Sequence, residues 1–148
     1  MSVPSDSEGA QAVRWSPQAV ALGMQMIAAS PAEATLMIPY RLDLVGDPQT
    51  GVIAGGVVTT LLDHTCGHAA AMALAEAGPV ATLDLRIDYM RAAEPGQAIY
   101  AHAHCYKLTH SIAFVRATAY DRDPADPVAT AQAAFMRTAA APEPAVTP

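Results

Sequence analysis

The chain has little cysteine and little positive charge, and each shortage excludes a class of protein. Only two of its 148 residues are cysteines, Cys66 and Cys105, and both lie inside apolar segments. Such a pair is too sparse for a secreted disulfide framework and fits reduced thiols in the cytoplasm. With 14 acidic and 8 basic residues the net charge is −6, which argues against a nucleic-acid interface.

Long apolar runs and targeting signals are missing as well. No stretch stays apolar for the length of a bilayer span, and the N-terminus MSVPSDSEGAQAV has neither the basic nor the apolar region of a signal peptide. We therefore expect a soluble, cytoplasmic protein with no membrane partner. Residues 1–15 and 139–148 are small, polar or rich in proline, which predicts flexible tails around one domain at 16–138.

The first part of this domain mixes helix and strand signals. Ser16 followed by Pro17 is typical of a helix N-terminus, and we expect a short helix over 17–29. A strand over 32–40 should follow, and then a strand end and turn over 41–51.

The middle of the chain predicts one long helix, and the rest predicts strands. The helix should run from about Gly55 to Ala77 and is apolar nearly all round, so a sheet must wrap it. The first strand alternates, which places Thr82 on the face opposite Leu83. Short connections predict an antiparallel meander and an α+β fold, a curved antiparallel sheet around a central helix. The predicted strands cover residues 80–92, 96–110, 111–123 and 127–138.

Asp63 is the unexpected residue, because it places a carboxylate in the middle of the apolar helix. Burying a charge is costly unless it is paired or opens on a wet pocket, and no Lys or Arg lies within one helical turn. One interpretation is structural: Asp63 lies on a wet edge of the helix, or pairs over a long range with Arg86 or Arg91. The other is a general base or a nucleophile.

Gly55 and Gly56 provide a second part of a site. They open the long helix, where the first N–H groups have no intrahelical acceptor and the helix dipole is positive, so an oxygen that gains negative charge there would be stabilised as an oxyanion. The structural alternative is a tight turn into the helix. Asp63 lies seven residues beyond Gly56, about 10 Å along the axis, so a single reacting group cannot touch both on the same helix.

These motifs together resemble a known family. The segments GVIAGGVVTTLLDHTCGHAA and VATLDLRIDYMRAAEPGQAIY look like the hotdog-fold acyl-CoA thioesterases of the phenylacetate-degradation type, the PaaI-like family. That family has a glycine pair opening the central helix, an acid two turns later, and a strand of the pattern TxxLxIxYlRPA. The likeness spans about Thr35 to Thr138 and implies the hotdog fold. Hotdog proteins also include dehydratases and acyl-binding proteins, so function depends on the site.

The resemblance implies a role for each motif. Asp63 would activate water or attack the thioester carbonyl, Gly55 would donate its N–H to the oxyanion beside Gly56, and Thr82 would orient the water. The implied substrate is an acyl-CoA, with no further cofactor. Family members pair their sheets and form sites at the dimer interface, so a homodimer, and a homotetramer as a dimer of dimers, are expected. The chain departs from the pattern at Ala54, where the family commonly has His, and offers Asp47-Pro48 near a family Asn.

The remaining candidates are histidines and basic residues. Two interpretations of His64 and His68 stay open: they replace part of the missing family imidazole near the substrate, or they are hydrogen-bonded helix histidines. A metal site drawn from these and from the strand pair His102 and His104 lacks the Glu of a zincin helix, and we expect none.

The phosphates of coenzyme A need cations, and four residues near strand ends could supply them. Arg91 and His110 are the preferred candidates, followed by Lys107 and Arg116. Solvated strand-end charges are the plain alternative for each. Three other functions stay open: a dehydratase, an acyl-CoA-binding protein without turnover, and a structural oligomer.

Overall fold

The structure is a computed structural model, and it describes residues 15–74 and 78–139. Most of both predicted tails therefore lies outside the described residues. The helices are α1 (Pro17–Ala21) and α2 (Gly55–Ala73), with a 3-10 turn at Leu42–Leu44. The strands are β1 (Gln25–Ser30), β2 (Glu33–Ile38), β3 (Val45–Asp47), β4 (Val52–Ile53), β5 (Val80–Tyr89), β6 (Ile99–Leu108), β7 (Ile112–Tyr120) and β8 (Ala129–Arg137).

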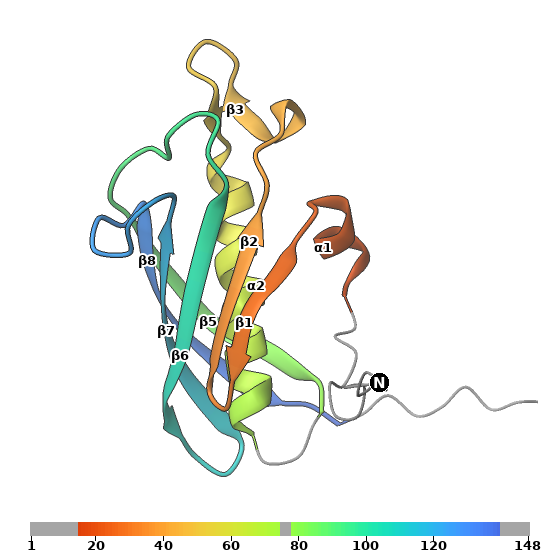
Figure 1. Ribbon diagram of the computed structural model, residues 1–148. Coiled ribbons are helices and arrows are strands. Elements are labelled where there is room, and N and C mark those ends of the chain that lie inside the picture. The colour runs from red at the N-terminus through yellow and green to blue at the C-terminus, as the bar shows by residue number, and fades with distance from the viewer. Residues whose placement is uncertain (1–14, 75–77, 140–148) are drawn as a thin grey trace, which may run out of the picture.

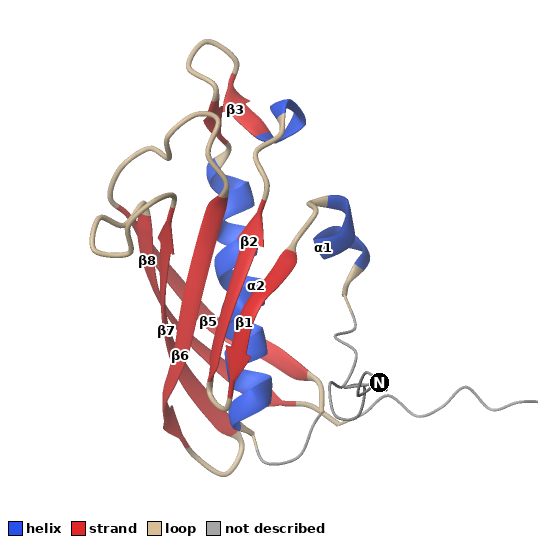
Figure 2. Cartoon of the chain, viewed as in Figure 1, coloured by secondary structure: helices blue, strands red, loops and turns tan. Residues whose placement is uncertain are grey.

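Six strands form one antiparallel sheet in the order β1-β2-β6-β7-β8-β5. The sheet curves along one side of α2 (Figure 1), and the same view coloured by secondary structure separates the single long helix from the strands (Figure 2). The predicted α+β architecture is confirmed, but the simple meander is wrong: only β6, β7 and β8 follow it. The connection over 90–98 carries the chain across the end of the sheet, so β5 pairs with β8 rather than with β6.

The predicted helix over 17–29 is wrong in its second half. Ser16 caps α1 by accepting a hydrogen bond from Ala19 N, but Gly23 has a φ of 69°, a conformation that a helix cannot continue through. The next residues form β1, which pairs with β2 from Gln25 opposite Met37 to Ser30 opposite Glu33. Sheet hydrogen bonds therefore outweigh the local helical pattern.

The segment after β2 forms a small hairpin, where the sequence predicted only a strand end and a turn. β3 and β4 pair with Val45 opposite Ile53, and Gly51 turns the chain with a φ of 76°. Tyr40 Oη donates to the carbonyl of Gly51 at 2.8 Å. The hairpin stands beside the N-terminal end of α2 (Figure 1).

The core lies between α2 and the inner face of the sheet. That face is rich in alanine, and these short side chains let the helix pack close to the strands. The helix fills the space with Leu61, Leu62 and Cys66, all fully buried. The buried alanines of the sheet are Ala34, Ala101, Ala103, Ala113, Ala117, Ala119, Ala129, Ala131 and Ala133.

The sheet does not wrap the helix completely. Asp63, His64 and Gly67 lie on a side of α2 that is only partly covered. The predicted helix end at Ala77 is wrong, because α2 ends at Ala73 and Leu74 already has an extended backbone with φ −74° and ψ 123°; residues 75–77 lie outside the described residues. Neither described helix has the length and apolar character needed to cross a membrane.

Candidate active site

Asp63 opens on a cavity at the partly covered side of α2. The carboxylate is half-buried, and Thr82 Oγ1 of β5 donates a hydrogen bond to Asp63 Oδ1 at 2.8 Å. The long-range pairing proposed as the structural alternative is absent, because the guanidinium of Arg86 contacts Asp88 at 3.3 Å and that of Arg91 contacts Asp121. The cavity measures about 330 Å³ and is lined by Asp63, His64, Gly67, His68, Ala71, Val80, Thr82 and Phe135.

A β-bulge places Thr82 next to Asp63. Thr82 pairs with the buried Phe135, but the register shifts before Asp84, which pairs with Ala134. The extra residue is Leu83, and it turns Thr82 onto the helix-facing side of β5 together with Leu85. The strict alternation predicted from the sequence put Thr82 on the opposite face, and that assignment is wrong. The bulge thus creates the contact between β5 and the helix carboxylate.

The glycine pair lies at the N-terminus of α2, as predicted. Gly55 and Gly56 are both exposed, and their N–H groups have no intrahelical acceptor because they are the first residues of the helix. A Cβ built on Gly56 meets no described atom within 4 Å, so a ligand can approach the backbone closely. Ala54 precedes the pair as the N-cap and makes no side-chain capping hydrogen bond.

Tyr89 holds this helix terminus against β5, and sequence reasoning missed it. Its hydroxyl donates to the carbonyl of Gly55 at 2.8 Å and also contacts Thr59 Oγ1. In the alternating pattern of residues 80–92, Tyr89 reads only as one more apolar position. Its position as the last residue of the strand, with a hydroxyl that needs a partner, was the available signal. Together with Thr82, it fixes β5 to α2 at two points.

His64, Cys66 and His68 lie on α2 next to Asp63. His64 Nδ1 donates to the carbonyl of Thr60 at 3.0 Å, which leaves Nε2 to accept from Ser16 Oγ at 3.0 Å. Burial, with a smaller contribution from His64, lowers the pKa of His68, so this ring is neutral at pH 7. Burial, followed by the charge of Asp63, raises the pKa of Cys66 to about 12. The thiol stays protonated and cannot serve as the nucleophile.

The two histidine pairs lie on opposite sides of the sheet. His102 and His104 are exposed on its outer face, whereas His64 and His68 line the cavity on the other side. In residues 15–74 and 78–139, no group of three or more His, Cys, Asp or Glu side chains could hold a metal ion.

Arg91 and His110, the preferred candidates for phosphate binding, lie away from this cavity. Arg91 makes a bidentate contact with Asp121 at 2.9 and 2.7 Å and an ion pair with Asp126 at 3.3 Å. The guanidinium beside it holds the pKa of Asp121 well below its usual range. Arg91 thereby ties the chain after β5 to the β7–β8 connection. His110 is exposed in the turn between β6 and β7.

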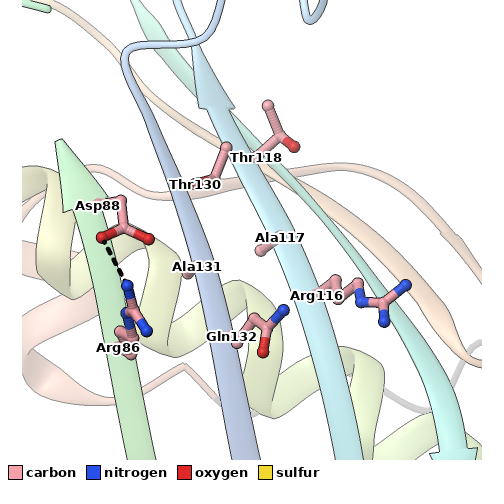
Figure 3. Close-up of a pocket in the computed structure, with 8 residues that line it drawn as sticks. All are labelled: Arg86, Asp88, Arg116, Ala117, Thr118, Thr130, Ala131 and Gln132. Carbon is pink, nitrogen blue, oxygen red and sulfur yellow. Dashed lines mark hydrogen bonds and ion pairs between the residues drawn. The ribbon is translucent and has the colours of Figure 1, made fainter. Parts of the chain in front are cut away.

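A second hollow of about 350 Å³ lies on the outer face of the sheet. Figure 3 shows Arg86 and Asp88 in contact on β5, and Arg116 on β7. Gln132 lies on β8, the strand between β5 and β7. The guanidinium of Arg116 stacks over the ring of Tyr106 on β6, 4.0 Å from its centroid. The two arginines therefore have separate partners and do not converge on one anion.

The chain is similar to known proteins in sequence and in structure. Residues 50–128 match the family model described as the thioesterase superfamily. A candidate esterase of Halobacterium salinarum is 40% identical over 75 residues, which is 49% of this chain and 50% of that protein. The chain thus spans about half the length of this curated relative.

Solved structures match over most of the chain. A protein from Pseudomonas aeruginosa is 42% identical, with a TM-score of 0.75 over 82% of this chain and 90% of that one. A mutant of the phenylacetic acid degradation protein PaaI from Thermus thermophilus is 26% identical, with a TM-score of 0.72 over 83% of this chain and all of that one. The predicted hotdog fold and the likeness to PaaI proteins are confirmed.

Proposed function

Because the chain belongs to the thioesterase superfamily, we propose that it hydrolyses the thioester bond of an acyl-CoA. The observation that carries this proposal is the half-buried Asp63, fixed by Thr82 at 2.8 Å and open to a cavity lined by apolar side chains and two histidines. Within the described residues no Lys or Arg forms an ion pair with Asp63, and a carboxylate that reaches a cavity in this way is suited to general base catalysis. The fully buried, protonated Cys66 offers no competing nucleophile.

The proposed reaction divides between two groups. Asp63 accepts a proton from water as the water attacks the thioester carbon, or attacks that carbon itself and forms an anhydride that water then hydrolyses. Thr82 holds the carboxylate through one oxygen, which leaves the other free for either route. The N–H of Gly55 stabilises the oxyanion, and the coenzyme leaves as a thiolate that takes up a proton.

We propose that a second copy of the chain completes the site. Gly55 and Asp63 are eight residues apart on α2, about 12 Å along the axis, which is too far for one thioester to touch both. β5 is an edge of the sheet, and its Leu83 and Tyr89 are 52% and 50% exposed. A ten-residue edge with apolar side chains is suited to strand pairing. A homodimer through β5, and a homotetramer as a dimer of such dimers, remain proposals, as does a cytoplasmic location.

The coenzyme end of the substrate is less constrained. Arg91 could bind a phosphate only by giving up its contacts with Asp121, whereas His110 is exposed and unobstructed. His64 uses both ring nitrogens within the protein, so its contribution to substrate binding would be through the shape of the cavity wall.

The test is thiol release from a panel of short, medium, long and aryl acyl-CoAs. Wild type should release thiol, and Asp63→Asn should lower kcat by about a hundredfold or more, the size expected for losing a catalytic base. Asp84→Asn, an exposed carboxylate on the same strand as Thr82, is the matched control and should keep wild-type rates. Equal rates for wild type and Asp63→Asn would refute the role of Asp63.

A single-turnover reaction in oxygen-18 water separates the two routes. If Asp63 is the nucleophile and water opens the anhydride at the carbonyl carbon of Asp63, the first turnover places unlabelled carboxylate oxygen in the acid product and label in the enzyme. If it is the base, the label enters the product directly. Binding of acyl-CoA without thiol release would instead favour an acyl-CoA-binding protein.

A further inference from the structure

The cavity beside Asp63 continues along α2 beyond the carboxylate. Gly67 and Ala71 lie one and two turns further down the helix, so the lined stretch from Asp63 to Ala71 is about 12 Å long. Val80 and Phe135 form its wall on the sheet side. The carboxylate and its hydroxyl donor lie at one end, and the rest is lined by apolar side chains together with the imidazole of His68. An acyl group whose carbonyl reached Asp63 would therefore extend toward Ala71.

The absence of a side chain at Gly67 leaves space between α2 and the ring of Phe135. A Cβ built on Gly67 would lie 3.4 Å from Phe135 Cε1, at ordinary contact distance, so any side chain there would occupy the space above the ring. Phe135 is 2% exposed and pairs across the sheet with Thr82. Its position is fixed by the core, and the cavity cannot deepen on that side without disturbing the packing.

His68 forms the wall on the remaining side. Its ring contacts Trp15 edge-on, with centroids 5.5 Å apart and planes at 64°. Trp15 packs against the hydrophobic core, so the tryptophan backs the imidazole. One turn earlier, Ser16 Oγ and the carbonyl of Thr60 hold the ring of His64. The segment around α1 thus holds both histidines and restricts their movement away from the cavity.

From this arrangement we propose that His68, backed by Trp15, limits the size of the acyl group that the cavity accepts. The inference rests on the proposed thioesterase function and adds the residue that determines its specificity. Replacing the imidazole by a methyl group would open the cavity toward Trp15, so bulkier acyl groups would fit. Adding a methyl group at Gly67 would narrow the cavity beside Phe135 and exclude them.

The experiment compares selectivity rather than activity. We would measure kcat/KM for wild type, His68→Ala, Gly67→Ala and Trp15→Ala on a graded series of linear acyl-CoAs from acetyl to decanoyl. His104→Ala, which removes an exposed imidazole on the outer face of the sheet, is the matched control. The reported quantity is the ratio of kcat/KM for each acyl chain to that for the shortest chain hydrolysed, because a general loss of stability or activity cancels in it.

The size of the expected effect follows from methylene discrimination in apolar pockets, where one carbon changes kcat/KM by about 10-fold to 200-fold. For the first chain length that wild type rejects, His68→Ala should raise the ratio about tenfold or more, with Trp15→Ala moving it the same way. Gly67→Ala should lower the ratio for the longest chain that wild type accepts. This second variant tests the same cavity if His68→Ala does not fold.

The outcomes separate the inference from the function on which it rests. If wild type hydrolyses acyl-CoAs but His68→Ala and Gly67→Ala keep the same chain-length profile as His104→Ala, the size limit lies elsewhere and the inference is wrong, while the thioesterase proposal stands. If wild type releases thiol from no acyl-CoA, the proposed function fails and the inference fails with it. Opposite shifts in the two cavity variants would establish His68 and Gly67 as the size filter.

Discussion

Gly46→Ala tests whether the start of α2 is positioned for catalysis by the hairpin beside it. A Cβ built on Gly46 would lie 2.8 Å from the Cα and 3.1 Å from the Cβ of Ala54, whereas ordinary contact begins at 3.4 Å. The two backbones would have to separate by at least 0.6 Å. Ala54 N also donates to the carbonyl of Leu44 at 2.9 Å, so the shift would pull on the residue that caps α2.

The displacement should reduce both stability and activity. Overpacking of this kind costs about 1–3 kcal/mol, and 1 kcal/mol corresponds to a drop in Tm of about 3–5 °C for a chain of this size. Ala54 directly precedes Gly55, whose N–H is the proposed oxyanion donor. Since a 1 Å misplacement costs about a hundredfold in rate, a shift of roughly half that size should lower kcat/KM about tenfold.

Gly96→Ala is the matched control. Gly96 has a φ of 84°, so alanine there is strained, but a Cβ would meet no described atom within 4 Å. It should lower Tm without moving α2 and should leave kcat/KM unchanged. Thermal melts and thiol-release assays on both variants decide the matter. The reasoning would be refuted if Gly46→Ala kept wild-type Tm and kcat/KM, or lost no more activity than Gly96→Ala.

Two further predictions concern the titratable groups Asp121 and Cys66. Arg91 lowers the pKa of Asp121. The stability from this contact is therefore complete above about pH 4, the ordinary pKa of Asp, and is lost as the pH falls through the lower pKa of the folded state. Asp121→Asn should lower Tm at pH 7 and flatten the loss of stability in acid, and an unchanged acid profile would contradict this. Cys66 is fully buried, and its pKa is raised to about 12. When the native protein is treated with an alkylating reagent, peptide mass mapping should find Cys66 modified only as fast as the chain unfolds. Rapid labelling of the native protein would disprove the burial argument.

Local patterns predicted the parts of the fold that depend on neighbours in sequence. Alternation located β5 to β8, and the apolar run between glycines located α2. Local patterns did not predict β1, because the Met-rich and Ala-rich segment 24–30 fits a helix as well as a strand, and only pairing with β2 decides between them. β5 pairs with β8, a strand far away in the sequence. No local periodicity predicts which distant strand it pairs with.

The candidate site was also predicted only in part from the sequence. Asp63 was predicted from the physical cost of a carboxylate in an apolar helix, and the role of Thr82 came from the family resemblance. The structure brings them to 2.8 Å across nineteen positions of sequence, but through a bulge that alternation could not foresee. Arg91 looked free because its partner, Asp121, follows thirty positions later. Tyr89 was missed because its hydroxyl acts on a backbone carbonyl, which no motif records.

The contacts between α2 and β5 connect the chemistry to the proposed assembly. Thr82 and Tyr89 both reach from β5 to the helix, one to Asp63 and one to Gly55. The strand that orients both proposed catalytic elements is therefore also the edge of the sheet, with apolar side chains exposed. Pairing of that edge with a second copy would cover those side chains and restrain Thr82 and Tyr89 at the same time. It would also bring a second helix N-terminus toward Asp63, so that dimer formation and active-site assembly become one event.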